Sequence, residues 1–122
     1  TQRITNWYKN ELWEKRGKKN IQFALDNIQE LKIFLNKKNV NLIIVLYPWP
    51  FEIDDEEIRE KYLEFIVPSL DEINVNKLVI YQDFLKGNIY ENISENYLYN
   101  DIHFNKNGNK IITNNLINYI NQ

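Results

Sequence analysis

Hydrophobic side chains recur every three or four positions over residues 20–38, and this spacing predicts an amphipathic helix with one buried stripe. The next apolar run, residues 42–47, is continuous and β-branched, and its short length predicts a strand covered on both faces. Pro48 and Pro50 follow and lack the amide hydrogen that a sheet requires, so residues 47–50 are expected to form a loop at the carboxyl end of this strand. The predicted helical stripe consists of Ile21, Ala24, Leu25, Ile28, Leu31, Phe34 and Leu35.

The second half of the chain repeats this order of helix and strand. Acidic residues 54–57 open a segment with one apolar helical face, and Pro68 is expected to break this helix. Residues 77–81 form another short apolar run and predict a second buried strand. Residues 86–100 lack a sustained period and are interpreted as a long loop with one helical turn, whereas residues 107–120 predict a terminal helix.

The order of these elements indicates an α/β fold. A helix lies in the connection between the two predicted strands, so we expect them to run parallel within one domain, residues 1–122. Two strands alone make a poor sheet, and the missing strands are expected to come from a preceding segment or from a partner copy. A short helix is also predicted within residues 1–18, where the apolar side chains are Trp7, Tyr8, Leu12 and Trp13.

Composition narrows the classes of function. The chain has 122 residues, with 15 lysines plus arginines against 17 aspartates plus glutamates, and this balance gives no electrostatic argument for nucleic acid. The absence of cysteine excludes disulfides, thiolate zinc sites and thiol nucleophiles. No apolar run approaches the roughly 20 residues that span a bilayer, so no membrane segment is expected in this chain. Because the first residue is Thr1 rather than methionine, we expect further sequence upstream, and the compartment stays open.

The segment with the most chemistry contains the only histidine, His103, two positions after Asp101. Histidine accepts and returns protons near neutral pH, and a carboxylate bonded to one ring nitrogen fixes the tautomer. On spacing alone, such a pair is more often an ordinary surface contact than a catalytic one. The residues around the pair therefore decide its interpretation.

The pattern Asp101-x-His103-x-Asn105-x-x-Gly108, followed by an apolar helix, resembles the last sequence block of SGNH/GDSL hydrolases. The order of elements before it, within residues 19–121, is also similar to that family. The resemblance implies a three-layer, flavodoxin-like parallel sheet flanked by helices, of which this chain is the carboxy-terminal part. It further implies a serine ester hydrolase or O-acyltransferase, with His103 as general base and Asp101 orienting it. The commonest family form places the aspartate three residues before the histidine, where this chain has Asn100.

The nucleophile block of that family, Gly-Asp-Ser, is not recognisable in this chain. The two serines, Ser69 and Ser94, lack its strand-to-turn setting and are interpreted as structural. The chain alone is therefore expected to be inactive, with the serine supplied by an upstream segment. The implied substrate is an acylated small molecule or carbohydrate, and the acyl group passes to water or to a sugar hydroxyl. No metal or cofactor is implied. Residues 54–57 are acidic, but they lack the alternating spacing of a calcium loop and are interpreted as a helix start.

Tyr47 and Trp49 are the candidate substrate-binding residues, because parallel sheets place ligands at the carboxyl ends of their strands. Two other interpretations of these aromatic side chains stay open. They form an aromatic plug over the sheet edge, or the chain is a non-catalytic α/β module that binds glycan or protein through residues 47–51. An unrelated α/β domain that matches the terminal block by chance is a further alternative. Asp83 is expected to hydrogen-bond within its loop, and Asn105 and Gly108 are expected to shape the turn by tolerating left-handed backbone.

Overall fold

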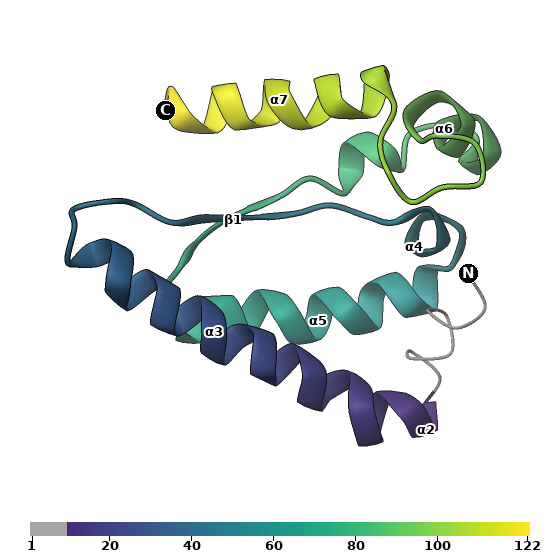
Figure 1. The fold of residues 1–122 in the computed structure, drawn as a ribbon. Coiled ribbons are helices and arrows are strands. Elements are labelled where there is room, and N and C mark those ends of the chain that lie inside the picture. The colour runs from purple at the N-terminus through teal and green to yellow at the C-terminus, as the bar shows by residue number, and fades with distance from the viewer. Residues whose placement is uncertain (1–9) are drawn as a thin grey trace. The chain divides into compact units, whose positions relative to one another are not determined.

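The computed structural model describes residues 10–122 and shows a mostly helical chain with a two-stranded parallel sheet (Figure 1). The predicted mixed α/β class is confirmed. The helix predicted within residues 1–18 lies partly outside the described residues, including Trp7 and Tyr8. The described elements are α2 (Asn10–Leu12), the π-helical segment η2 (Trp13–Gly17), α3 (Lys18–Asn36), β1 (Ile43–Leu46), α4 (Pro50–Asp54), α5 (Glu56–Glu72), β2 (Asn76–Val79), η3 (Gln82–Phe84), α6 (Ile89–Asn96) and α7 (Lys106–Ile120).

The chain divides into two compact units. The first consists of the chain through Ile44 together with Glu57–Lys77, and the second consists of Val45–Glu56 and Leu78–Gln122. The strands β1 and β2 each begin in the first unit and end in the second. All of the residues discussed below as candidates for chemistry, apart from Ser69, belong to the second unit.

Both predicted strands form, but neither is covered on both faces. Ile43, Ile44 and Val45 are half-buried, and Val79 is 42% exposed. The expectation of complete burial was wrong because the described residues do not cover both faces of this two-stranded sheet along its length. The pairing extends one residue past β2, where the Ile80 amide donates to the carbonyl oxygen of Leu46 at 2.8 Å.

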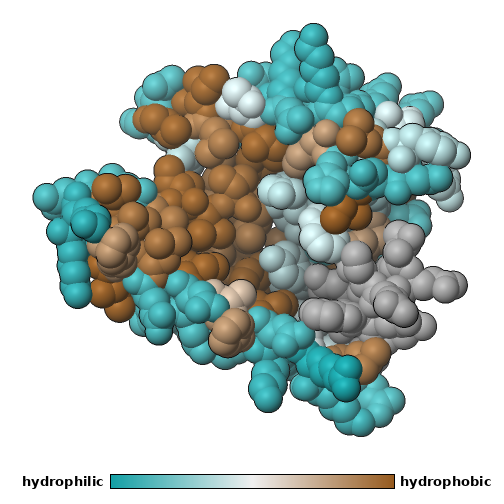
Figure 2. All heavy atoms as spheres, in the orientation of Figure 1, coloured by the Kyte–Doolittle hydropathy of each residue, from teal (hydrophilic) through white to brown (hydrophobic). Residues whose placement is uncertain are grey.

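In the first unit, α3 forms where the hydrophobic period predicts a helix, but its apolar stripe is only partly covered. Leu25 is buried, whereas Leu31 is 44% and Phe34 is 55% exposed. Figure 2 shows hydrophobic side chains along the upper side of this helix and mostly hydrophilic ones along its lower edge. The periodicity correctly predicts the helix and its face, but a covering layer must also exist for that face to be buried. The described residues do not provide one over the whole stripe.

The expectation that Pro68 ends the helix α5 was wrong. The helix runs from Glu56 to Glu72 and contains Pro68 inside it. Proline removes one backbone hydrogen bond, but its ring lies on the exposed side, while Ile66 and Leu70 are buried on either side of it. This burial stabilises the helix across the interruption. The Trp13 ring packs edge-on against Phe65 of α5, with ring centroids 5.7 Å apart.

The second unit has a core built from four fully or nearly fully buried side chains: Ile53, Ile80, Phe84 and Tyr97. Partly buried residues of β1, α6 and α7 pack against it. The loop predicted over residues 86–100 is largely the helix α6, because the Asn88 side chain accepts hydrogen bonds from the amides of Tyr90 and Glu91 and so caps the helix start. The terminal helix α7 forms as predicted. Among residues 10–122, no helix combines the length and hydropathy that crossing a bilayer requires.

Candidate active site

The only histidine of the chain lies near the tip of a tight turn between α6 and α7. The two arms of this turn are joined by an antiparallel bridge between Tyr97 and Phe104, and by a 2.9 Å hydrogen bond from the Leu98 amide to the His103 carbonyl. Asn100 at the tip has φ 54°, a left-handed conformation that asparagine adopts more readily than most residues. The turn thus holds the backbone on both sides of His103.

Asp101 and His103 contact each other directly. The Asp101 carboxylate oxygen Oδ1 lies 2.7 Å from His103 Nδ1, and it also accepts from the amides of Ile102 at 2.6 Å and His103 at 3.2 Å. The bond from the His103 ring, followed by the two amide bonds, lowers the pKa of Asp101 below its ordinary value. An ionised carboxylate can only accept, so Nδ1 carries the proton, and the neutral ring keeps Nε2 as its proton-accepting nitrogen.

The pair is open to solvent. The side chain of His103 is 74% exposed and that of Asp101 is 44% exposed. A general base has to reach the proton it removes, and here the ring of His103 is accessible to a group that approaches from outside the second unit. Asp101 and His103 therefore lie as close together as expected, although both side chains are exposed.

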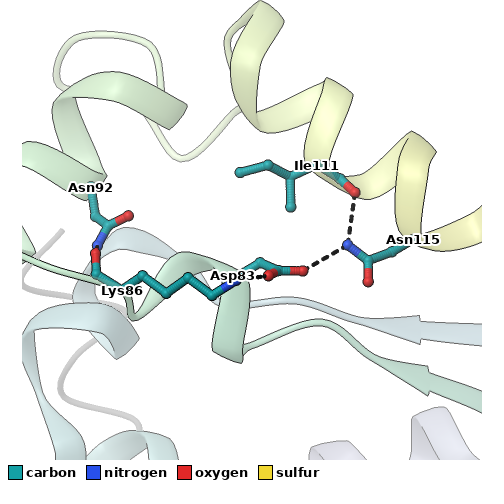
Figure 3. A network of polar contacts seen from close by, with 5 residues as sticks. All are labelled: Asp83, Lys86, Asn92, Ile111 and Asn115. Carbon is teal, nitrogen blue, oxygen red and sulfur yellow. Dashed lines mark hydrogen bonds and ion pairs between the residues drawn. The ribbon is translucent and has the colours of Figure 1, made fainter.

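Asp83, expected to hydrogen-bond within its loop, takes part in a polar network that also reaches α7 (Figure 3). Its carboxylate accepts from Lys86 Nζ at 2.5 Å and from Asn115 Nδ2 at 2.8 Å, and these bonds lower the pKa of Asp83. The Asn115 amide also donates to the carbonyl of Ile111 at 2.9 Å, and Asn92 donates to the carbonyl of Lys86. Through this network, Asp83 joins η3 to α7.

We expect the carboxyl group of Asp101 to titrate below 3.8, the ordinary pKa of aspartate, and to move back toward that value in His103→Ala. The ring of His103 makes the largest contribution to the lowered pKa, and the variant removes only that contribution. Because the folded-state pKa is depressed, the associated stabilisation is present above the unfolded-state pKa and is lost as the pH falls through the folded-state pKa. Carbon-13 NMR of the aspartate carboxyl groups measures the midpoint.

Asp83 is the matched control for this titration, because its lowered pKa arises from Lys86 and Asn115 and not from His103. Its midpoint should stay unchanged in His103→Ala. An Asp101 midpoint that is the same in both proteins would show that the ring bond is absent in solution.

Asn105 and Gly108 shape the turn, but not through left-handed backbone as expected. Asn105 is extended, with φ −82° and ψ −170°, and caps α7 by accepting from the amides of Asn107 at 2.8 Å and Gly108 at 3.2 Å. Its Nδ2 donates back to the carbonyl of Glu95 at 2.7 Å. Gly108 is required for a different reason: a Cβ built there would lie 2.2 Å from the carbonyl oxygen of Asn96, so only glycine lets α7 approach the end of α6 this closely.

The structure brings three of the four predicted site residues to one pocket of about 460 Å³. Tyr47 and Trp49, from the end of β1, line it together with His103. The Tyr47 ring packs on Phe104 with centroids 5.0 Å apart, and Tyr47 is 40% exposed. Asp101 does not line the pocket and reaches it only through its bond to His103. The complete lining is Tyr47, Trp49, Ile102, His103, Phe104 and Asn109.

Sequence reasoning missed Asn109, which adds an amide side chain to this pocket. No local pattern identified it, because its place at the pocket depends on how α7 packs in the second unit. The segment 47–51 is also shorter as a loop than expected, because α4 begins at Pro50 and includes Phe51. Trp49 is thus the last residue before a helix.

Neither serine lines the pocket, in agreement with their structural interpretation. The Ser69 hydroxyl donates to the carbonyl of Phe65 at 2.7 Å, and the Ser94 hydroxyl donates to the carbonyl of Glu91 at 3.0 Å. Both bonds lie within helices. In the described part of the chain, no group of three or more histidine or acidic side chains is arranged to hold a metal ion. No protein-family model, curated protein or solved structure matches the chain.

Proposed function

We propose that this chain forms the base-bearing part of an SGNH-type ester hydrolase or O-acyltransferase site. The observation that carries the proposal is the 2.7 Å contact between Asp101 Oδ1 and His103 Nδ1 beside a pocket that His103 also lines. In this role, His103 is the general base and Asp101 holds its tautomer and stabilises the imidazolium. The substrate is an acylated small molecule or carbohydrate.

The proposed reaction needs a serine from a segment outside this chain. His103 Nε2 removes the serine proton as the serine oxygen attacks the ester carbonyl carbon, and the protonated ring then gives this proton to the departing alkoxide. The resulting acyl-serine is attacked by water or by a sugar hydroxyl, whose proton passes to His103 and then to the released serine. The two half-reactions return both side chains to their starting protonation states.

The partly covered surfaces of the chain support a further segment. The apolar stripe of α3 is incompletely covered, and the sheet has two strands only in the described residues. A three-layer, flavodoxin-like sheet would add strands beside these two and would cover part of the apolar stripe. The His103 side chain, which is 74% exposed, is accessible to a group from such a segment.

A second candidate is a non-catalytic module that binds glycan or protein through the aromatic side chains at the end of β1. Tyr47 and Trp49 line the pocket whether or not a serine reaches it, and aromatic faces provide large apolar contact surfaces for ligands. In this alternative, Asp101 and His103 are a hydrogen-bonded surface pair. The two candidates differ in whether replacing His103 affects turnover or only binding.

We expect His103→Ala to lower the hydrolysis of p-nitrophenyl acetate by about 10³-fold or more in a protein that joins this chain to its serine-bearing segment. The members of a triad act together, so removal of the base removes most of the effect. The measurement is the initial rate of p-nitrophenolate release by the full-length wild-type protein and by the variant. Asp101→Asn should also reduce kcat, because the amide no longer enforces the Nδ1-protonated tautomer.

Lys106→Ala provides the control, because Lys106 is exposed, belongs to the same turn region and does not line the pocket. Its rate should equal that of the wild type. Normal turnover by His103→Ala would refute the proposed base. Absence of hydrolysis in the wild type, combined with ligand binding that depends on Trp49, would favour the non-catalytic module instead.

A further inference from the structure

Trp49 lies on a backbone segment that is unusually well restrained for a loop. Pro48 is fully buried and its carbonyl accepts a hydrogen bond from the Tyr97 hydroxyl. Pro50 follows directly as the first residue of α4 and restricts the residue before it to extended conformations. Trp49 is indeed extended, with φ −84° and ψ 159°. The backbone that carries one wall of the pocket is thereby held on both sides.

A buried carboxylate adds another restraint to this segment. Glu52 is 4% exposed, and its Oε2 accepts from the Trp49 amide at 2.8 Å. Its other oxygen, Oε1, accepts from the Tyr81 hydroxyl at 3.1 Å. Tyr81 is 2% exposed and follows the end of β2, so the carboxylate connects the segment after β1 to the segment after β2.

Helix stability alone does not account for burying this charge. Glu52 is the third residue of α4, where a glutamate usually accepts from the residue before the helix while its carboxylate stays near solvent. A cap of this kind contributes about 0.5–2 kcal/mol, whereas taking a carboxylate out of water costs several kcal/mol before its new bonds offset it. The helix α4 has five residues, so it gains little from such an arrangement. The bond from the Trp49 amide to Glu52 Oε2 restrains the Trp49 backbone.

We infer that Glu52 is a positioning residue for the pocket: its carboxylate fixes the Trp49 backbone so that the indole lines the pocket beside His103. The consequence for ligand binding rests on the proposed function of that pocket, but the positioning itself is a property of this chain. Glu52 acts through Trp49, because Glu52 does not line the pocket. Tyr81, which donates to the other oxygen, holds the carboxylate in place.

Fluorine NMR of the full chain with 5-fluorotryptophan tests this inference, with the Trp49 resonance assigned by its loss in Trp49→Phe. We expect Glu52→Ala to shift, broaden or split the Trp49 resonance, because the amide loses its acceptor and the indole samples several orientations. Glu52→Gln keeps an acceptor at the same place and should restore the single resonance. Tyr81→Phe keeps the carboxylate and should give a smaller shift than Glu52→Ala.

Glu95→Ala is the matched control, because Glu95 is an exposed glutamate of the same unit and its removal should leave the Trp49 resonance unchanged. Circular dichroism checks that each variant is folded, and Tyr81→Phe serves as the test if Glu52→Ala is not. A Trp49 resonance that is the same in the wild type, Glu52→Ala and Tyr81→Phe would overturn the inference, whatever the activity.

In a protein that hydrolyses ester, Glu52→Ala should raise KM about tenfold with little change in kcat, a loss of about 1.4 kcal/mol in binding. An inactive wild-type protein that includes the serine-bearing segment would refute the proposed function and leave the fluorine result to decide on Glu52.

Discussion

Gly108→Ala is expected to destabilise the chain by about 3 kcal/mol, the upper part of the range for forcing atoms into a packed site. The new Cβ would lie 2.2 Å from the carbonyl oxygen of Asn96 and 2.6 Å from the ring of Phe104. The oxygen belongs to the backbone at the end of α6, so it cannot move aside as a flexible side chain would. Urea unfolding followed by circular dichroism measures the effect as a lower midpoint with an unchanged slope.

The sign of this result is informative, because helix propensity alone predicts the opposite. Alanine is favoured over glycine inside a helix by about 1 kcal/mol, and Gly108 is the third residue of α7. Asn107→Ala, at the exposed neighbouring position, tests propensity without a clash and should be neutral or slightly stabilising. An increase in stability for Gly108→Ala would show that α6 and α7 do not approach each other in solution as closely as the structure indicates.

Phe84→Ala is expected to lower the free energy of unfolding by about 3–5 kcal/mol, the usual loss when a buried aromatic side chain is truncated. Phe84 is 0% exposed and stacks on Phe104, a wall of the pocket, with ring centroids 5.2 Å apart. The variant should therefore weaken both the core of the second unit and the support of the pocket. The urea midpoint gives the stability, and the tryptophan resonance of Trp49 reports on the pocket.

Phe23→Ala removes the same ring from α3, where Phe23 is 69% exposed. The free energy of unfolding should fall by less than about 0.5 kcal/mol, as for other surface substitutions. Equal losses at Phe23 and Phe84 would mean that the exposed side of α3 is covered in solution, and a concentration dependence of the loss would identify a second copy as the cover.

The sequence predicts the elements whose pattern is long or strongly apolar. α3 and α7 follow from their three-to-four spacing, and β1 follows from its β-branched run. α6 was missed because its eight residues form only a short helix with few apolar positions, and its start depends on a single cap at Asn88. The extent of burial was also overestimated, because periodicity identifies an apolar face but not the layer that covers it.

The candidate site was predictable in the part that is local in sequence. Asp101 and His103 could be paired from their spacing, whereas the presence of Asn109 in the pocket that Trp49 also lines depends on how α7 packs in the second unit. Glu52 gave no signal at all, because an acidic residue near a helix start is ordinarily exposed. Its burial and its bond from the Tyr81 hydroxyl arise only in the folded second unit, which no local pattern reveals.

One residue separates Asp101 from His103, and this closeness has a consequence for how the site is assembled. Bringing their side chains together closes almost no loop, so little chain entropy opposes it, and the turn supplies most of the restraint. The placement of Tyr47 and Trp49 beside His103 requires the packing of β1, α6 and α7. The Asp101–His103 contact and the aromatic walls of the pocket therefore depend on different length scales of the polypeptide: a short turn determines the contact, and the folded second unit determines the walls.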